Sequence, residues 1–324
     1  MIFQVPGGQK KTRIDKYLAN HIENSSRTKI KGAIQDGHVL VNSKNIKANY
    51  IVLPNDIIDI TLPYLPAKED VKPENIPLDI LYEDNYLMLI NKPAGMVTHP
   101  AYKNYSGPRV NALMYYMGDN AAQLPKLDGD IEDGGDERAG IVHRLDKLTS
   151  GIMVVAKDED TQRKLSYLFS KHDIEREYWA IVWGHFKEKK GVIDKELGRN
   201  PRDRKKFAVV KDGKHAVTEY EVVEEFDFLS LVKLKLHTGR THQIRVHMHA
   251  VGHPVFGDND YDGRTAHGIQ MSTKLKQRIN NLLELMPRQA LHAKVLGFVH
   301  PITKEHLRFE SDLPEDMNLL IEKL

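Results

Sequence analysis

The sequence contains no cysteine, which excludes disulfide scaffolds, zinc–thiolate sites, iron–sulfur clusters and thiol nucleophiles. No apolar run approaches the ~20 residues of a membrane-spanning helix, and the first residues lack the apolar segment of a signal peptide. We therefore expect a soluble, cytoplasmic protein without a membrane partner. A strong charge of either sign is also missing, because 47 Lys and Arg residues face 45 Asp and Glu residues. Only the local distribution of charge can therefore indicate a nucleic-acid partner.

Motifs for nucleotide cofactors and serine hydrolysis are absent as well. The chain has no glycine-rich phosphate loop ending in Lys-Ser or Lys-Thr, and no Gly-x-Gly-x-x-Gly fingerprint. Ser150 lies in Thr-Ser-Gly and not in the Gly-x-Ser-x-Gly turn of serine hydrolases. We therefore expect a reaction that uses no cofactor.

The composition and the prolines indicate two domains. With 324 residues, 40% of them apolar and 28% charged, the chain can bury a sizeable core and fill about two domains. The segment 63–77 holds four prolines and charges of both signs, which is typical of a linker. We expect a small domain at 1–64, a linker at 65–77 and a larger domain at 78–324. Residues 1–70 contain ten Lys and Arg against seven Asp and Glu, so the small domain is mildly basic.

The hydrophobic pattern predicts helices and strands in both domains. In the small domain, apolar residues at helical spacing predict helices near 14–22 and 27–36, followed by alternating strands. The large domain contains many strand-like segments in hairpin-like succession, with helices expected at 158–172 and 241–251. Because few helices separate the strands, a mixed, largely antiparallel sheet is favoured over a doubly wound one. The expected fold class is α+β, with a small α/β domain preceding the large one.

Two segments are strongly charged, and a third is rich in histidine. Residues 199–214 contain seven Lys and Arg against two Asp, which favours a contact with a phosphate backbone over an ordinary surface loop. Residues 127–137 contain six acids and no base, as in a solvated loop. Residues 237–253 contain five histidines but no carboxylate that could complete a zinc site. We therefore expect no metal, and histidines that form hydrogen bonds or face RNA.

The most informative segment is GIVHRLDKLTSGIMVVAK at 140–157, where a polar turn joins two apolar strands. Asp146 lies in this turn, and a carboxylate at the junction of two core strands is held in place as catalysis requires. The alternative is a structural aspartate that closes the turn by accepting hydrogen bonds from the hydroxyl groups of Thr149 or Ser150. The spacing alone leaves both interpretations open.

Several motifs of the chain together resemble the RluA/RluD-type pseudouridine synthases. The first residues also resemble the S-four-like RNA-binding domain that many members carry, through Arg13-Ile14-Asp15, Ser26-Arg27 and the segment 36–42. The RluD type, which acts on large-subunit (23S) ribosomal RNA, is the most similar, because of this domain and the Arg-Glu-Tyr form of the tyrosine motif. The motifs of the large domain are NKPAGMVTHP (91–100), AGIVHRLDKLTSGIMVVAK (139–157), REYWAIVWG (176–184), HTGRTHQIRVHMHAVGHPVFGD (237–258) and LHAKVLGFVHPIT (291–303).

The resemblance implies a redox-neutral isomerisation, in which the N1–C1′ bond of a uridine breaks and the uracil rejoins the ribose through C5. It implies that Asp146 is the essential aspartate, that Arg245 pairs with it, and that Tyr178 stacks on the target uracil. We expect the forked guanidinium of Arg245 to hold the Asp146 carboxylate through two hydrogen bonds. Because a uracil within folded RNA must be flipped out before it reacts, Arg144 is expected to contact the RNA at the vacated position.

The expected partner is ribosomal RNA of the large subunit, or its assembly precursor, bound by a monomer. Three alternatives remain: a synthase that acts on transfer RNA, alone or together with ribosomal RNA; a non-catalytic RNA-binding factor of ribosome assembly; and a glycosidase. A glycosidase normally needs two facing carboxylates, and the sequence places Asp146 alone. The acidic insertion at 118–137 leaves the RNA target open. Further RNA contacts are expected from Arg13, Arg27, Lys29, Arg202, Arg204, Lys205, Lys206, Arg240 and His242.

Overall fold

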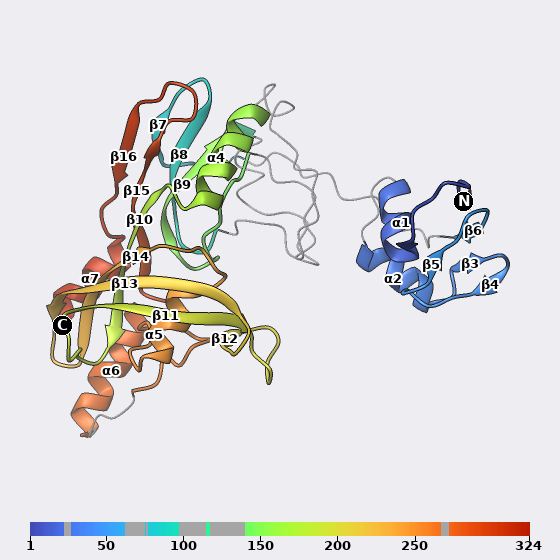
Figure 1. Cartoon of the computed structure of the whole chain (residues 1–324). Coiled ribbons are helices and arrows are strands. Elements are labelled where there is room, and N and C mark those ends of the chain that lie inside the picture. The colour runs from blue at the N-terminus through green and yellow to red at the C-terminus, as the bar shows by residue number, and fades with distance from the viewer. Residues whose placement is uncertain (23–26, 62–74, 76, 97–114, 117–139, 267–271) are drawn as a thin grey trace. The chain divides into compact units, whose positions relative to one another are not determined.

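The computed structural model describes residues 1–22, 27–61, 75, 77–96, 115–116, 140–266 and 272–324, apart from the side chains of 27–29. These residues divide into two compact units, one with described residues up to 61 and one with described residues from 75 onward (Figure 1). The predicted linker at 65–77 falls almost entirely outside the described residues, and so does the acidic insertion at 118–137. The domain boundaries predicted from the sequence therefore stay predictions.

The first unit is a small α/β module with a core of its own. Its elements are β1 (Ile2–Gln4), β2 (Thr12–Arg13), α1 (Ile14–His21), α2 (Arg27–Gln35), β3 (Val39–Val41), β4 (Lys44–Asn45), β5 (Ile51–Val52) and β6 (Ile57–Ile60). Four strands form an antiparallel sheet in the order β1-β6-β3-β4, and β2 pairs with β5. Ile14, Leu18 and Ile30 of the two helices pack with Val39 and Ile58 of the sheet.

The second unit is built on one large sheet. Its elements are β7 (Ile80–Glu83), β8 (Leu87–Lys92), β9 (Ser150–Ala156), α4 (Glu159–Lys171), β10 (Glu175–Trp183), β11 (Lys190–Arg199), β12 (Phe207–Val209), β13 (Lys214–Glu225), β14 (Leu229–Leu236), α5 (Gln243–Ala250), α6 (Thr273–Leu285), β15 (Leu291–Val299), β16 (His306–Glu310) and α7 (Glu315–Lys323). The strand order is β12-β11-β13-β14-β10-β15-β9-β8-β7, with β16 beside β15. Its paired strands are antiparallel apart from β15 and β9, which are parallel. The predicted mixed, largely antiparallel sheet and the α+β class are confirmed.

The two helices predicted for the large domain are present. The helix expected at 158–172 is α4, which begins after Asp158 because the side chain of that residue accepts a hydrogen bond from the backbone N–H of Thr161. The helix expected at 241–251 is α5, which begins only at Gln243 because His242 has a left-handed backbone with φ of 55°. Among the helices that the structure describes, none is long and apolar enough to cross a membrane.

The central strands carry separate cores on their two faces, because successive side chains of a strand point to opposite sides. On one face, Tyr178 and Ala180 of β10 pack in a cluster that includes Met248 of α5. On the other face, Ile181 and Trp183 pack in a cluster with residues of α6 and α7. The face that α5 covers is the face that carries the candidate site.

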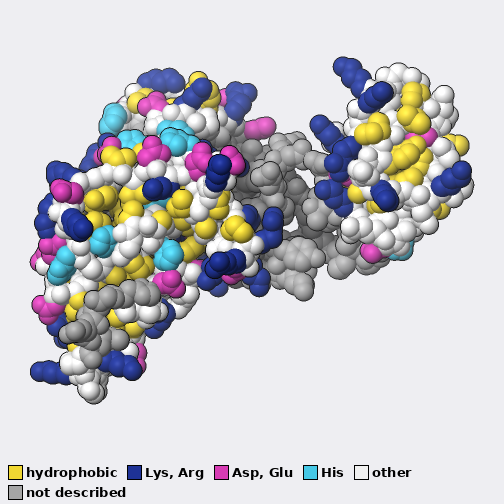
Figure 2. Space-filling model, turned by 60° about the horizontal axis from the view of Figure 1, so that its bottom comes forward, with side chains coloured by type: hydrophobic (Ala, Val, Ile, Leu, Met, Phe, Trp, Pro, Cys, Tyr) yellow, Lys and Arg dark blue, Asp and Glu magenta, His cyan; other side chains and the backbone are white. Residues whose placement is uncertain are grey.

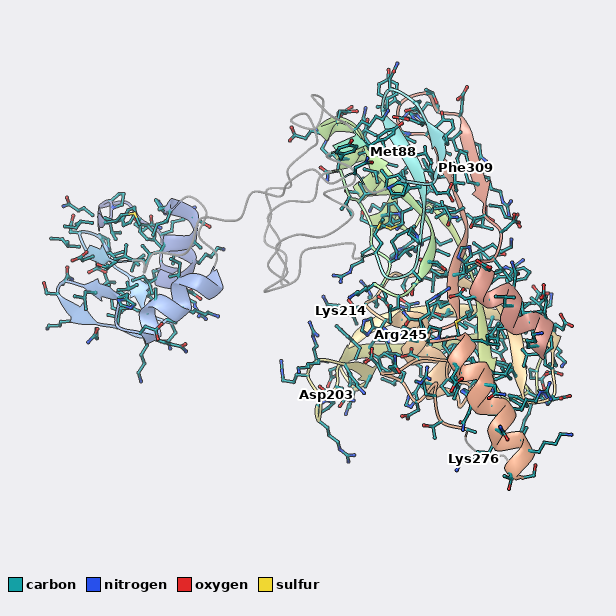
Figure 3. All side chains as sticks on the ribbon, turned by 180° about the vertical axis from the view of Figure 1, so that it is seen from behind. Met88, Asp203, Lys214, Arg245, Lys276 and Phe309 are labelled. Carbon is teal, nitrogen blue, oxygen red and sulfur yellow. The ribbon has the colours of Figure 1, made fainter. Side chains whose placement is uncertain are left out.

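Charged side chains are distributed differently over the two units. Figure 2 shows Lys and Arg side chains gathered along one side of the first unit, whereas basic, acidic and histidine side chains are interspersed on the visible face of the second. Figure 3 shows Asp203 on a loop that projects from the end of the sheet near β12, and Arg245 closer to the middle of the unit. The basic segment 199–214 therefore lies at one edge of the sheet.

Candidate active site

Asp146 lies in a short loop that leads directly into the central strand β9. The loop ends where β9 begins at Ser150. Leu145 is buried in the core cluster that also contains Tyr178, whereas Arg144 is exposed. The side chain of Asp146 keeps 19% of its surface accessible. The order His-Arg-Leu-Asp therefore anchors the loop through Leu145 and leaves the carboxylate within reach of a substrate.

Two basic side chains hold this loop by its backbone. The Nζ of Lys92, which is buried at the end of β8, donates to the carbonyl oxygen of Lys147 at 3.2 Å and also to two carbonyls of its own segment. The Nη1 of Arg288 donates to the carbonyl oxygen of Leu148 at 3.1 Å. The residues directly after Asp146 are therefore held by side chains from the end of β8 and from the segment before β15. These contacts give the carboxylate a defined position.

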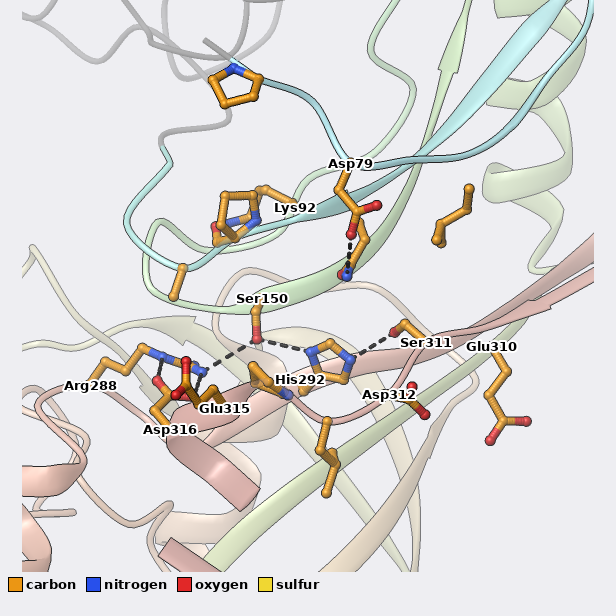
Figure 4. Close-up of a pocket in the computed structure, with 17 residues that line it drawn as sticks. Asp79, Lys92, Ser150, Arg288, His292, Glu310, Ser311, Asp312, Glu315 and Asp316 are labelled. Carbon is orange, nitrogen blue, oxygen red and sulfur yellow. Dashed lines mark hydrogen bonds and ion pairs between the residues drawn. The ribbon is translucent and has the colours of Figure 1, made fainter. Parts of the chain in front are cut away.

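The hydroxyl groups that follow Asp146 have other partners. The Oγ1 of Thr149 accepts a hydrogen bond from Gln289, and the Oγ of Ser150 bonds to Nδ1 of His292 at 2.9 Å. Figure 4 shows Ser150 and His292 in a pocket of about 690 Å³ whose lining includes neither Asp146 nor Tyr178. Within the described residues, no hydrogen bond joins the Asp146 carboxylate to either hydroxyl. The interpretation of Asp146 as a residue that closes the turn through Thr149 or Ser150 is therefore wrong.

Arg245 of α5 contacts Asp146, but not in the expected way. Its Nη1 donates to Oδ2 of Asp146 at 3.1 Å, which is a single hydrogen bond. The forked pair of nitrogens, Nε and Nη2, instead holds the buried carboxylate of Asp258 at 2.6 and 2.8 Å, and Nη2 also donates to Asp260 at 2.6 Å. The expected two-bonded pairing with Asp146 is wrong. Because Asp258 has no exposed side-chain surface, it gains most from the stronger, bidentate contact.

The surroundings of Arg245 keep it charged and fixed. Burial alone would lower the pKa of Arg245, but the hydrogen bonds and charges of Asp258, together with the charge of Asp146, raise it above its usual value. The Asp258 carboxylate also accepts hydrogen bonds from the backbone N–H groups of Asp260 and Tyr261. The ring of Tyr261 lies 4.9 Å from Cζ of Arg245, a distance suited to a cation–π contact. Arg245 thus presents one immobile donor to Asp146.

His242 is the second neighbour of Asp146. Its Nε2 lies 3.8 Å from Oδ1 of Asp146, and its Nδ1 bonds to the hydroxyl of Tyr261 at 2.8 Å. Burial lowers the pKa of His242, and the nearby Arg245 adds to this effect against the opposing charge of Asp146. The imidazole is therefore neutral at neutral pH.

The other histidines of the run at 237–253 each have separate partners. The buried His247 bonds to Thr218, His249 to Asp262, and His253 to the carbonyl oxygen of Trp183. Across the described ranges, no group of three or more His, Asp or Glu side chains is placed to hold a metal ion.

Tyr178 lies in the middle of β10, between Leu234 of β14 and Ala293 of β15. Its side chain is largely buried on the face that carries Asp146, and its hydroxyl makes no hydrogen bond to any residue that the structure describes. Burial raises the pKa of Tyr178, and the negative charge of Asp146 raises it further against the opposing effect of Arg176. Asp146, Tyr178 and Arg245, which the sequence places far apart, are therefore brought together on one face of the sheet.

The predicted RNA-binding residues of the second unit lie around this face. Arg144 is exposed beside Asp146, and Arg240 is exposed on the loop before α5, where its Nε donates to the carbonyl oxygen of His215. Lys206 donates to the carbonyl oxygen of Asp260 at 2.8 Å, which ties the basic loop to the surroundings of Arg245. In the basic loop, Arg202, Arg204 and Lys205 are exposed and form no ion pair with any described residue.

In the first unit, the one predicted RNA contact whose side chain can be described is Arg13. Its Nε and Nη2 hold the fully buried carboxylate of Asp15 at 3.1 and 3.0 Å, while 44% of the Arg13 side chain stays exposed. Part of its charge is therefore balanced within the unit. The side chains of Arg27 and Lys29 lie outside the described residues.

The sequence interpretation assigned no role to Asp258 and Asp260. Both follow Gly257, which has φ of 79° and lies so close to the backbone of Arg288 that a Cβ would come within 2.2 Å of its carbonyl oxygen. The sequence does contain a signal for these residues, which is a glycine followed by two acids at alternate positions. The glycine permits a turn that other residues cannot form. It indicates a fixed turn that presents carboxylates.

Comparisons with known proteins show which family the chain resembles. The model of the RNA pseudouridylate synthase family matches residues 86–250, and that of the S4 domain matches residues 12–58. An uncharacterized RNA pseudouridine synthase of Chlorobaculum parvum is 45% identical over 100% of this chain and 97% of its own length. Ribosomal large subunit pseudouridine synthase D of Zymomonas mobilis is 40% identical over 96% of this chain and 93% of its own length.

A solved structure shares the fold of most of the chain. Human RNA pseudouridylate synthase domain containing 4 matches 75% of this chain and 92% of its own, with a TM-score of 0.57 and 24% identity. The resemblance predicted from the sequence motifs is confirmed, since the family model spans more than half of the chain and the Chlorobaculum relative matches all of it. The chain therefore belongs to the RNA pseudouridylate synthase family and is an isomerase with an N-terminal S4 domain.

Proposed function

We propose that this enzyme converts uridines of large-subunit ribosomal RNA into pseudouridine, with Asp146 as the catalytic residue. The observation that carries the proposal is the Asp146 carboxylate, held at 3.1 Å by Arg245 on the face of the sheet that carries Tyr178. The choice of ribosomal RNA is supported by the name of the Zymomonas relative and by the S4 domain. Transfer RNA, alone or together with ribosomal RNA, is the alternative substrate. We further propose that the enzyme works as a monomer in the cytoplasm.

Asp146 begins the reaction as nucleophile or base toward the target nucleotide. Arg245 occupies its Oδ2, whereas its Oδ1 makes no hydrogen bond within the described residues and has the neutral His242 at 3.8 Å. Oδ1 is the atom that we assign to the chemistry. Because Asp258 fixes the guanidinium of Arg245, the carboxylate of Asp146 keeps its orientation when the substrate binds.

In the proposed isomerisation, the N1–C1′ bond breaks, the uracil rotates, the C5–C1′ bond forms, C5 releases its proton to solvent and N1 takes up a proton in its place. The target uridine is flipped out of its stack at a cost of a few kcal/mol, and the ring of Tyr178 stacks on the uracil. Since burial raises the pKa of Tyr178, its hydroxyl is protonated at neutral pH, so the stacked ring adds no negative charge beside the Asp146 carboxylate. The exposed guanidinium of Arg144 fills the position that the flipped base has left.

The two domains divide the work in this proposal. The domain at 1–64 contributes affinity for the phosphate backbone through its basic residues, including Arg27 and Lys29, and the domain at 78–324 performs the reaction. Arg202, Arg204, Lys205 and Lys206 extend the contact at the edge of the large sheet.

Release of tritium from RNA carrying [5-³H]uridine tests the proposal, because C5 loses its hydrogen when it becomes the glycosidic carbon. Unmodified transcripts of large-subunit ribosomal RNA and of transfer RNAs are compared, with the wild type and Asp146→Asn side by side. We expect release from the ribosomal transcript, none with Asp146→Asn, and RNA affinities of the two proteins within a few fold of each other.

Each outcome of this assay decides one part of the proposal. Release from transfer RNA alone would overturn the substrate assignment. Normal turnover by Asp146→Asn would overturn the catalytic role of Asp146, and a joint loss of binding and turnover would give this residue a structural role. If no naked transcript reacts, ribosomal particles from a strain that lacks the enzyme are tested in the same way. Failure on those particles as well would refute the choice of ribosomal RNA.

A further inference from the structure

Arg176 is a buried cation on the same face of β10 as Tyr178. It is 8% exposed, and its Nε makes no hydrogen bond to any part of the chain that the structure describes. Its Nη2 reaches the carbonyl oxygen of Leu236 at 3.5 Å, which is the limit of a hydrogen bond. The ring of Phe169 lies 6.0 Å from its Cζ. Most of the hydrogen-bonding capacity of this guanidinium is therefore unused.

The acidic residues beside Arg176 in the sequence do not compensate its charge. Glu175 pairs with Arg308 across to β16, and Glu177 pairs with Lys233 of β14. Both therefore use their carboxylates on side chains other than Arg176. Within the described residues, Arg176 forms no salt bridge at all.

An unpaired buried charge is costly, and an arginine cannot avoid the cost by losing its proton. Burial lowers the pKa of Arg176, but a guanidinium starts so high that it remains charged at neutral pH. Breaking a buried ion pair commonly destabilises a protein because it leaves one charge without a partner. A buried cation that lacks a partner in the protein without ligand is placed to bind an anion of a ligand.

The surroundings of Arg176 are themselves basic. His172, at the end of α4, has its pKa lowered by burial and by the positive charges of Arg176 and Arg240. His172 and Arg240 are exposed, so two basic side chains lie at the surface near the buried one. Arg176 and Arg240, two cations without a paired carboxylate among the described residues, attract an anion more strongly than either alone, and the neutral imidazole of His172 can add an N–H donor.

Gly239 lies directly against the guanidinium, an approach that only a residue without a side chain allows. This residue lies on the exposed loop before α5, and a Cβ there would come within 2.8 Å of Nη1 of Arg176. Arg176 and Tyr178 are two residues apart on one strand face, a separation of about 6–7 Å. A nucleotide whose base lies on Tyr178 therefore has its own backbone within reach of this side chain.

We propose that Arg176, with Arg240 and His172 at the rim, forms a binding site for one RNA backbone phosphate next to the flipped uridine. The proposal rests on the proposed RNA substrate and adds a site to it. The phosphate compensates the buried guanidinium, and this contact fixes the nucleotide so that the uracil meets Tyr178 and the ribose meets Asp146. The charge-assisted hydrogen bonds that an arginine forms with phosphate oxygens suit this role.

Single neutral methylphosphonate linkages test the site directly. Equilibrium binding is measured with Asp146→Asn, which prevents turnover, on RNA in which each phosphate around the target uridine is replaced in turn. We expect one linkage whose replacement weakens binding at least tenfold. Addition of Arg176→Gln removes the effect of that linkage and of no other. Arg176→Gln alone lowers the salt dependence by about one phosphate contact.

The controls separate this site from a structural role. Arg308→Gln removes a half-exposed arginine that Glu175 and Glu310 already pair, and it should leave every linkage effect intact. Gly239→Ala crowds the guanidinium without removing it, so it should weaken binding at the same linkage while the melting temperature is kept. Equal linkage effects with and without Arg176 would overturn the site. A wild type that releases no tritium from any RNA would instead refute the proposed function.

Discussion

Two buried arginines flank the candidate active site, and their surroundings are opposite in charge. Arg245 contacts three carboxylates, those of Asp146, Asp258 and Asp260. Arg176 contacts no carboxylate among the described residues, and the charged groups near it are basic. The same side chain therefore serves two purposes. In our proposals, the arginine orients the catalytic carboxylate where the chain supplies the anion, and it receives an anion of the substrate where the chain supplies none.

In the proposed function, this separation of charge also orients the RNA. The region of Arg245 is negative overall, because one guanidinium and a neutral His242 face three carboxylates. A backbone phosphate placed directly against these three carboxylates would be repelled, whereas one at the site proposed for Arg176 would be attracted. The electrostatic difference over a short stretch of the sheet then favours one direction of the RNA strand across Tyr178.

The largest expected effect comes from Arg245→Lys. An ammonium group cannot hold Asp258 through two bonds and Asp146 through a third, so the buried Asp258 loses its bidentate partner. We expect the free energy of unfolding to fall by about 3–5 kcal/mol and tritium release to fall at least a hundredfold. Urea unfolding and the tritium assay measure the two losses. Near-normal activity in a stable variant would show that Asp146 does not depend on the guanidinium.

A matched pair of aspartates tests which partner matters to Arg245. Asp258 is fully buried and accepts two hydrogen bonds from Arg245, whereas the side chain of Asp260 is 49% exposed and accepts one. Asp258→Asn should cost about 2–4 kcal/mol of unfolding free energy, and Asp260→Asn less than about 1 kcal/mol. Urea titrations of both variants under one buffer make the comparison. Equal losses would mean that burial does not set the strength of these contacts.

The sequence was sufficient to predict which residues of the site meet, but not how they bond. Asp146 and Arg245 lie in two motifs that the family resemblance pairs. Asp258 forms the bidentate contact because the fold buries its carboxylate completely. The spacing of residues in the sequence does not predict which carboxylate is buried. The burial of Arg176 could have been predicted from the sequence, because its alternation with Tyr178 and Ala180 places it on the buried face of a strand. The sequence does not show that its neighbours there are Phe169, Leu236 and Gly239 and not an acidic residue.

The fold was predictable to a similar degree. Segments in hairpin-like succession gave the antiparallel sheet, because sequential strands tend to pair. The parallel pairing of β9 with β15 was not predictable, since it joins His292 and Ala293 to Ser150 and Gly151 from a distant part of the chain. That pairing places β9 next to β15, whose other neighbour is β10, so the site depends on pairings between distant segments that local patterns do not contain.

Arg245 is buried with carboxylate partners, and Arg176 is buried without one among the described residues. The buried histidines differ from both because they are neutral. Burial lowers the pKa values of His247 and His292 to about 4, against ~6.5 in an unfolded chain. Between these values the unfolded chain binds more protons, so stability is complete above pH 6.5 and is lost as the pH falls. We expect a loss of about 2 kcal/mol per histidine at pH 5. Urea titrations at pH 7 and pH 5 measure it.

The control for this pH effect is an exposed histidine. His292→Gln should flatten the fall in stability between pH 7 and pH 5, whereas the exposed His306→Gln should leave it unchanged. An unchanged slope in His292→Gln would show that this buried group is not neutral, and would remove the contrast with Arg176.

The smallest effect per residue is expected at the exposed basic loop. Its side chains provide an exposed counterpart to the buried Arg176. Arg202, Arg204 and Lys205 are exposed and pair with no carboxylate that the structure describes, so the RNA contacts that we propose for them would be screened by salt. The triple change to Gln should reduce the salt slope of RNA binding by about two units, with kcat and the unfolding free energy unchanged. Methylphosphonate scanning should then show small losses spread over several linkages. A loss confined to one linkage would mean that a surface cation can fix a phosphate as firmly as a buried one, and burial would no longer explain Arg176.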